Sequence, residues 1–247
     1  MIIYILWLRQ MKRYFRSRSR IIGSLAQPLL FLFALGYGLG PVFQKAGQGS
    51  YLQFLVPGII AQSILFTAMF SGIEIIWDRR FGFLKEMLVA PISRLEIMVG
   101  RTLGGTTVAI FQGLVVLLIS FLAGFKVANI FSFLTALIFM FLIAILFAGL
   151  GTAIASVLED MQGFQLIMNF LIMPLLFLSG TFFPVKGLSG ALSVIVKIDP
   201  LSYGVDGLRG ALSGVYGFGF WPDFLVLALI ASILTVIGSY LFFKVQI

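Results

Sequence analysis

The sequence predicts an all-α membrane protein with six transmembrane helices, and three observations support this. Hydrophobic residues make up 60% of the 247 residues and charged residues only 11%, against about 25% charged residues in an ordinary soluble domain. The mean hydropathy is +1.11. Six stretches carry no charged residue, and each is long enough to cross a bilayer, which takes about 20 mostly apolar residues. A soluble fold could not hide this much apolar surface behind so few charges.

The charge-free stretches give the approximate position of each span. We place the spans at residues 21–40, 56–76, 102–124, 131–157, 164–183 and 223–243. Pro28 and Pro174 fall inside two of them, and both are tolerable because neighbouring helices and water can satisfy the freed carbonyl groups. We expect residues 1–247 to form a single transmembrane domain.

The distribution of Lys and Arg predicts the orientation, since cytoplasmic connections carry more of them. An even number of spans puts both termini on one side. Twelve of the 17 basic residues fall on that side and five on the other. We therefore expect a multi-pass protein of the cell (inner or plasma) membrane with both termini in the cytoplasm. The first apolar run is longer than that of a signal peptide and lacks a clear cleavage site.

The missing residue types exclude several classes of site. The chain has no Cys and no His, which removes thiolate chemistry, the commonest general base and the commonest metal ligand. Its nine acids are scattered, and it has no P-loop motif for ATP. We therefore assign no catalytic and no metal-binding residue. The net charge of +8 comes mostly from residues that flank apolar runs, which favours contact with anionic lipid over binding of nucleic acid.

Ionisable groups are nearly absent from the spans. Glu74, near the inner end of the second span, is the exception. Ion-coupled carriers usually need buried ionisable groups, so the sequence argues against ion coupling. Polar residues such as Gln62 and Gln112 are expected mainly to form hydrogen bonds between helices.

Residues 1–20 predict an amphipathic helix that lies in the membrane interface. At 100° per residue, apolar and basic side chains fall on opposite sides. The apolar side carries Ile3, Trp7, Met11, Tyr14 and Phe15, and the basic side carries Arg9, Lys12, Arg13, Arg16 and Arg20. Trp7, Arg9, Arg13 and Arg16 are the candidate interface residues. Two roles stay open: a lipid anchor that orients the first span, or a cytoplasmic shelf on which a partner pushes.

Residues 78–100 form the one cytoplasmic connection of substantial length. Phe83, Leu84, Met87 and Leu88 would form an apolar stripe on a short helix. Pro91 would end that helix, and the Ser93–Glu96 spacing is a capping-box signature for the next one. The stripe either docks in the groove of a partner or packs back against the inner ends of the protein's own spans.

Residues 184–220 are apolar but interrupted by glycine and proline, which predicts an outer re-entrant or interfacial helical hairpin. Asp199-Pro200 would start a short helix that carries Tyr203, Asp206 and Arg209. Asp206 and Arg209 stand three residues apart and can pair on one helix face. The segment would serve as a fixed lid or as a moving gate.

Two segments carry a family resemblance. The loop DRRFGFLKEMLVAPISRLEIMVGR resembles the E-R-E-x-G-T-L-E-x-L-x-x-T-P loop of ABC-2 type permeases. The more specific segment, FLSGTFFPVKGL…KIDPLSYGVDGLRGAL, is similar to the same family's S-G-x-x-F-P…N-P-L-T-Y-x-x-D-x-L-R segment. Asp199 departs from the usual Asn, and Phe83 departs from the usual Thr. The chain resembles most the branch of drug and lipid exporters with the daunorubicin-resistance and nodulation-exporter permeases; the polysaccharide-exporter branch stays open.

The resemblance implies the transmembrane subunit of an ATP-driven exporter. Two copies would pair with two ABC ATP-binding subunits, which would bind ATP and Mg²⁺, and cargo would be an amphipathic drug, lipid or glycan-linked molecule. The coupling helix that docks on the ATPase would comprise Phe83, Leu84, Glu86, Met87 and Leu88. The outer gate would comprise Pro184, Asp199, Pro200, Tyr203, Asp206 and Arg209. On this basis Leu84→Asp or Met87→Asp should uncouple ATP hydrolysis from transport without unfolding the protein.

Two other function classes stay open. An ATP-independent channel or secondary carrier would fit the uncharged bundle, and transport without ATP or any partner would favour it. An intramembrane enzyme would have to use Asp206 with Arg209 or the Glu159–Asp160 pair. Activity that survives Asp206→Asn and Glu159→Gln would remove the support for an enzyme.

Overall fold

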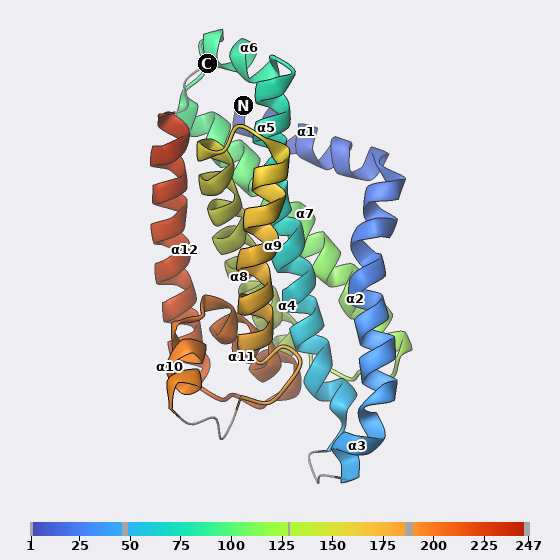
Figure 1. Cartoon of the computed structure of the whole chain (residues 1–247). Coiled ribbons are helices and arrows are strands. Elements are labelled where there is room, and N and C mark those ends of the chain that lie inside the picture. The colour runs from blue at the N-terminus through green and yellow to red at the C-terminus, as the bar shows by residue number, and fades with distance from the viewer. Residues whose placement is uncertain (1, 46–48, 128, 186–189, 245–247) are drawn as a thin grey trace.

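The computed structural model describes residues 2–45, 49–127, 129–185 and 190–244 and shows a bundle of long helices (Figure 1). Six helical stretches in these residues are long and apolar enough to cross a membrane, which confirms the predicted number of spans. The spanning helices are α2 (Arg18–Gly38), α4 (Tyr51–Ser71) with α5 (Ile73–Arg80), α7 (Arg94–Leu122), α8 (Ile130–Val157), α9 (Met161–Leu178) and α12 (Phe220–Phe243). The shorter helices are α1 (Ile2–Arg16), α3 (Gly40–Lys45), α6 (Phe83–Val89), α10 (Ala191–Ile198) and α11 (Pro200–Ser213).

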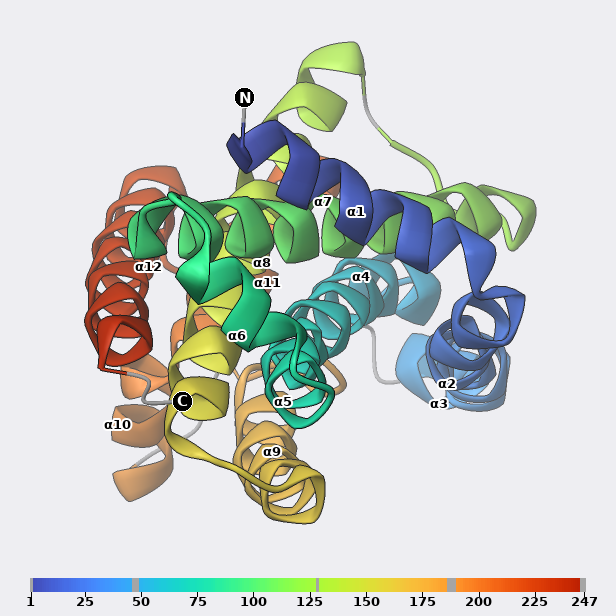
Figure 2. The same cartoon turned by 90° about the horizontal axis from the view of Figure 1, so that it is seen from above.

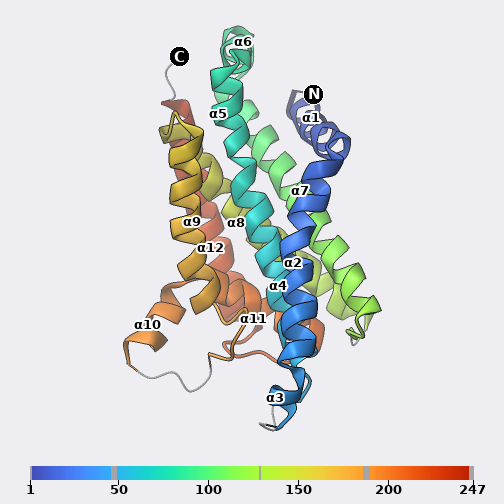
Figure 3. The same cartoon turned by 45° about the vertical axis from the view of Figure 1, so that its right-hand side comes forward.

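The two ends of the bundle carry different short helices. We call them the α6 end and the α11 end. The α6 end also holds the start of α1 and the end of α12, as six spans require (Figure 1). There α5 and α6 project beyond the neighbouring spans (Figure 3). The opposite end holds α3, α10 and α11 (Figure 1).

Burial divides the spans into a core and an outer layer. In the window that qualifies each stretch as a span, 72% of the residues of α4–α5 are buried, but only 17% of those of α2 and α12 and 22% of those of α9. Helix α4 packs against α2, α7, α8 and α11. A helix that is apolar all round belongs either in a protein core or in lipid. The exposed apolar faces of α2, α9 and α12 therefore suit lipid or another apolar surface.

Helices α4 and α5 meet at Gly72 and form one span, which packs against α8 with the backbones almost in contact. A Cβ atom on Gly72 would lie 2.3 Å from the carbonyl oxygen of Gly151, and one on Gly151 would lie 2.3 Å from that of Met69. No real side chain fits in either place. These two glycines therefore set the distance between α4–α5 and α8.

We expect Gly72→Ala to lower the thermal stability of the purified protein, because α4–α5 and α8 must move apart to admit the methyl group. Overpacking of this kind costs about 1–3 kcal/mol, and melting in detergent should show it as a shift of several degrees. Gly23→Ala is the matched control, since a Cβ atom on Gly23 meets nothing within 4 Å. Equal melting temperatures for both variants would show that the helices adjust freely.

Helix α1 lies across α7, as the view from above shows (Figure 2). Its buried residues are Leu6, Gln10, Met11 and Tyr14. Close approach depends on glycines of α7: a Cβ atom on Gly104 would lie 2.6 Å from the Cγ of Gln10. Met11 and Tyr14 of the predicted apolar side are buried against the bundle, whereas Phe15 of the same side is 50% exposed. The helix also ends earlier than predicted, at Arg16.

Local signals predicted the segment between the second and third spans correctly. Gly82 adopts the left-handed conformation, with φ of 79°, and starts α6 after a sharp turn. Ser93 caps α7, and its side chain and that of Glu96 form the expected capping box. The result is the predicted order of a short helix, a break at Pro91 and a long helix.

Candidate functional site

Helix α6 turns part of its predicted apolar stripe into the bundle. Leu84 is 1% exposed and Met87 is 6% exposed. Phe83 and Leu88 are half-buried, and Glu86 is exposed. The stripe thus packs back against the protein's own bundle through Leu84 and Met87.

The side of α6 that faces away from the bundle is formed by different residues. We define the α6 patch as the exposed Phe81, Lys85, Glu86 and Val89, of which Phe81 is 69% and Val89 is 85% exposed. Trp77 extends the patch from α5, because its ring stacks on that of Phe81 with 5.3 Å between centroids. Of these residues only Glu86 is a predicted coupling residue, since the period of the stripe does not reveal which side of a short helix faces the bundle.

Beneath α6, five charged residues from three helices form what we call the Asp78 cluster. Its members are Arg9 and Arg13 of α1, Glu74 and Asp78 of α5, and Arg101 of α7. Arg9 binds Asp78 through both terminal nitrogens, at 2.9 Å from Oδ1 and 3.1 Å from Oδ2. Arg101 also binds Oδ2 of Asp78. The bidentate geometry and the second arginine tie α1, α5 and α7 together at one carboxylate.

The Asp78 cluster also contacts α6. The guanidinium carbon of Arg9 lies 3.9 Å from the ring centroid of Phe83, which is a cation–π contact. Nη2 of Arg101 lies 4.0 Å from Sδ of Met87. Arg101 itself is only 4% exposed. A displacement of α6 would therefore also displace Arg9 of α1 and Arg101 of α7, which both bind Asp78.

The roles of Asp78 and Arg101 are not evident from the sequence alone, where Arg101 flanks the third span and Asp78 begins the cytoplasmic connection. The available signal was the spacing of Glu74 and Asp78, which at four residues puts both acids on one helix face. Which arginines they meet depends on how α1 lies on α7, and local sequence does not determine that.

The candidate interface residues of α1 have mixed surroundings. Arg9 belongs to the Asp78 cluster, and Arg13 reaches it at 3.6 Å from Glu74 and 3.8 Å from Asp78. Nε1 of Trp7 donates to Oγ1 of Thr107 at 2.9 Å. Arg16 is exposed. The predicted basic face of α1 is thus partly an intramolecular binding face, and the placement of α1 in a lipid interface stays a prediction.

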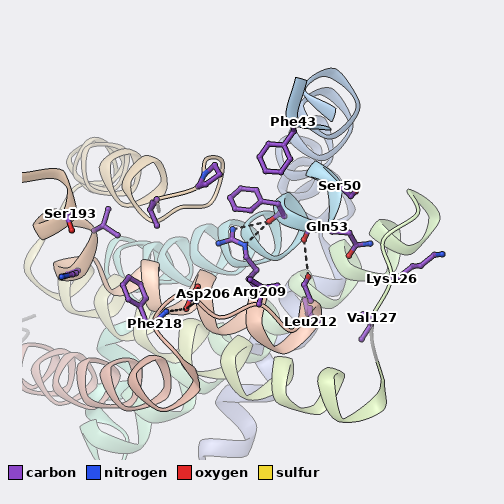
Figure 4. A pocket seen from close by; sticks show the side chains of 18 residues that line it. Phe43, Ser50, Gln53, Lys126, Val127, Ser193, Asp206, Arg209, Leu212 and Phe218 are labelled. Carbon is purple, nitrogen blue, oxygen red and sulfur yellow. Dashed lines mark hydrogen bonds between the residues drawn. The ribbon is translucent and has the colours of Figure 1, made fainter. Parts of the chain in front are cut away.

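At the α11 end, a cavity of about 630 Å³ lies among α3, α4, α10, α11 and the adjoining loops (Figure 4). Its apolar lining includes Phe43, Phe54, Val196, Leu212 and Phe218, and its charged lining includes Lys126, Lys197, Asp206 and Arg209. Pro184, Asp206 and Arg209 are the predicted gate residues that reach it. Asp199, Pro200 and Tyr203 do not line it.

Asp206 and Arg209 bind the backbone rather than each other, which corrects the pairing that their spacing suggested. Asp206 accepts hydrogen bonds from the amides of Gly217 and Phe218, each at 2.8 Å. Arg209 donates to the carbonyl of Gly180 at 2.9 Å. It also donates to the carbonyl of Phe54 at 3.3 Å, a bond that Figure 4 marks with a dashed line. Its guanidinium also lies 4.0 Å from the Phe54 ring centroid. Backbone groups of other segments occupy each side chain, so Asp206 binds α11 to the loop at Gly217 and Arg209 binds it to α4 and to Gly180.

The remaining gate candidates shape the corner between α10 and α11. Asp199 is buried and caps α11 by accepting from the amide of Leu201 at 2.8 Å, and Pro200 occupies the first position of the helix. The hydroxyl of Tyr203 donates to the carbonyl of Lys197 at 2.8 Å. Asp223, in the first turn of α12, was not predicted; it is fully buried and lies near Asp206.

Burial raises the pKa of the Asp199 carboxyl group to about 7, although the hydrogen bond from Leu201 opposes the shift. The folded state then holds this proton more tightly than the unfolded state, so stability falls as pH rises from about 4 to 7 and levels off above. We expect Asp199→Asn to gain on the order of 2 kcal/mol over the wild type between pH 5 and 7. Melting curves across this range check the expectation, with Glu159→Gln as an exposed control. A constant difference between Asp199→Asn and wild type would contradict it.

Comparison with known proteins identifies the family of the chain. The family model for the ABC-2 type transporter matches residues 2–213. The chain is 29% identical over 198 residues to nodulation protein J of Rhizobium leguminosarum bv. viciae, covering 79% of this chain and 76% of that protein. It is 30% identical over 198 residues to nodulation protein J of Rhizobium meliloti (strain 1021), covering 79% and 75%. It is 29% identical over 214 residues to the putative transport permease ycf38 of Pyropia yezoensis, covering 84% and 72%. This chain belongs to the ABC-2 type transporter family and is a membrane transport permease.

Proposed function

We propose that the chain is the transmembrane subunit of an ATP-driven exporter in the cell membrane. Two copies would assemble with two ABC ATP-binding subunits, and the α6 end, with both termini, would face the cytoplasm. The observation that carries the proposal is the α6 patch, an exposed surface of apolar and charged residues at the end that the basic residues mark as cytoplasmic. Exposed apolar groups in water are typical of a protein interaction site.

The chain needs such a partner for energy, because its sequence carries no P-loop. ATP and Mg²⁺ would bind to the ATPase subunits. Closure of the ATPase pair would push on α6. The buried Leu84 and Met87 and the Arg9–Phe83 contact would pass the displacement to α1 and α7. The docking role of the five predicted coupling residues would thus divide: Glu86 would meet the ATPase directly, and the others would hold α6 on the bundle.

Two other surfaces suit the second copy of the chain and the cargo. The exposed apolar faces of α2, α9 and α12 leave room for a second copy as well as for lipid. A path between two copies would end near the cavity at the α11 end, whose apolar and charged lining suits an amphipathic drug, lipid or glycan-linked molecule. Residues 184–220 would form the outer gate around it. Movement between inward- and outward-facing states is a shift of populations that the ATPase drives.

Reconstitution tests the proposal. The tagged chain and any P-loop protein that accompanies it would be placed in liposomes, and efflux of a fluorescent lipid would be measured with and without ATP. We expect efflux only with ATP and only with both subunits. Efflux that persists without ATP and without a partner would favour the alternative of a channel or secondary carrier.

A further inference from the structure

We propose that the groove at the corner between α1 and α2 binds the phosphate headgroup of an anionic phospholipid from the leaflet at the α6 end. The groove is open, has a volume of about 960 Å³ and is lined by residues of α1, by Ser17 and by the first two residues of α2, Arg18 and Ser19. Its charged lining consists of Arg9, Lys12, Arg13, Arg16 and Arg18 with a single acid, Asp78. Nothing in the proposed export function requires or names this site.

The charges of the groove are unbalanced. Asp78 is already bound by Arg9 and Arg101. Lys12, Arg16 and Arg18 are exposed and form no ion pair with the part of the chain that the structure describes. Three free cations on one surface attract an anion, and arginine binds phosphate oxygens with the geometry of its planar fork. An anion from outside the chain would find all three cations available.

The position of the groove relative to the predicted membrane favours a lipid as the source of that anion. The apolar stretch of α2 begins at Ile21, directly after the basic residues, and only 17% of it is buried. Ile22 is 69% exposed. If this face is in the hydrocarbon layer, Arg16 and Arg18 lie where the phosphate groups of that leaflet are. Ile5 and Leu8 give the same groove an apolar floor that can cover the first carbons of an acyl chain.

A bound headgroup would also act on the Asp78 cluster. Arg13 lines the groove and lies 3.6 Å from Glu74 and 3.8 Å from Asp78, which are long distances for ion pairs. A phosphate in the groove would bind Arg13 in competition with Glu74 and Asp78, and it would hold the end of α1 against the start of α2. This link to coupling rests on the proposed function, whereas the binding itself does not.

The test measures lipid retention on the full chain without any ATPase. The protein is purified in a non-ionic detergent, phosphatidylglycerol or phosphatidylcholine is added, and native mass spectrometry measures bound lipid. The groove variant is Lys12→Gln, Arg16→Gln, Arg18→Gln. The control variant, Arg80→Gln, Lys244→Gln, removes two exposed charges that lie at the same end of the bundle and outside both the groove and the α6 patch. Melting in phosphatidylcholine alone shows that both variants are folded.

We expect the wild type to retain phosphatidylglycerol in preference to phosphatidylcholine. A basic residue near the lipid surface is worth about fivefold in affinity, so the groove variant should bind phosphatidylglycerol about a hundredfold more weakly, and the control variant should stay within about threefold of wild type. Equal losses in the two variants, or no lipid preference in the wild type, would overturn the site. A groove variant that keeps the lipid and fails to bind the ATPase would also overturn it, in favour of an acidic protein surface. If the wild type binds phosphatidylglycerol but shows no ATP-driven efflux with its ATPase, that result would contradict the export proposal and leave the lipid site intact.

Discussion

Asp78→Ala is expected to destabilise the folded chain by about 3–5 kcal/mol, because it leaves Arg101 as a buried cation without its carboxylate. Arg101 is 4% exposed, and it shares Asp78 with Arg9. Thermal unfolding in detergent should show a fall of about 10 °C or more, at a few degrees per kcal/mol for a chain of this size. Glu159→Ala, which removes an exposed acid, should leave the melting temperature unchanged.

A double variant separates the buried charge from a general defect. Asp78→Ala with Arg101→Leu removes both the acid and the buried cation, so we expect it to melt higher than Asp78→Ala alone. Two losses that simply add would mean that Asp78 and Arg101 do not interact, and the Asp78 cluster would then not join α1, α5 and α7.

Leu84→Asp and Val89→Asp, on opposite sides of α6, should give opposite results. Leu84 is 1% exposed, so a carboxylate there is buried without a partner, and we expect loss of folded protein. This corrects the expectation from sequence that Leu84→Asp would uncouple transport in a folded chain. Val89 is 85% exposed, so Val89→Asp should melt like wild type but lose ATPase binding about tenfold or more. Melting curves and quantitative co-purification give the two readouts.

The converse pattern would contradict the assignment of the two faces. A folded Leu84→Asp chain that loses the ATPase would show that the stripe, and not the α6 patch, meets the partner. A Val89→Asp chain that binds the ATPase at wild-type strength would remove the patch from the contact. Val157→Asp, a similarly exposed change at the end of α8, serves as the control for a new surface charge.

Features that depend on neighbouring residues were predictable. The spans follow from runs of apolar residues, and the turn from α6 to α7 follows from Pro91, Ser93 and Glu96. The two helices around Asp199 and Pro200 follow from the cap and the proline at the first helical position. In each case, the residues that determine the structure lie within a few positions of it.

Features that depend on the relative placement of helices were not predictable. Asp78 meets Arg9 where glycines of α7 let α1 approach closely, and it meets Arg101 on α7 itself; these contacts span 69 and 23 residues of chain. The inward side of α6 depends on where the bundle leaves space. Asp206 and Arg209 have the right spacing for a pair, but loop amides and carbonyls 11 and 29 residues away compete for them.

The most direct test of an ATP-driven exporter is the composition of the complex in its own membrane. The tagged chain would be crosslinked in native membranes, purified in mild detergent and analysed for stoichiometric partners. We predict one P-loop ATPase subunit for each permease subunit, in a complex with two of each, and loss of the ATPase from the Val89→Asp chain. A homo-oligomer without any ATPase, even after crosslinking, would contradict the account.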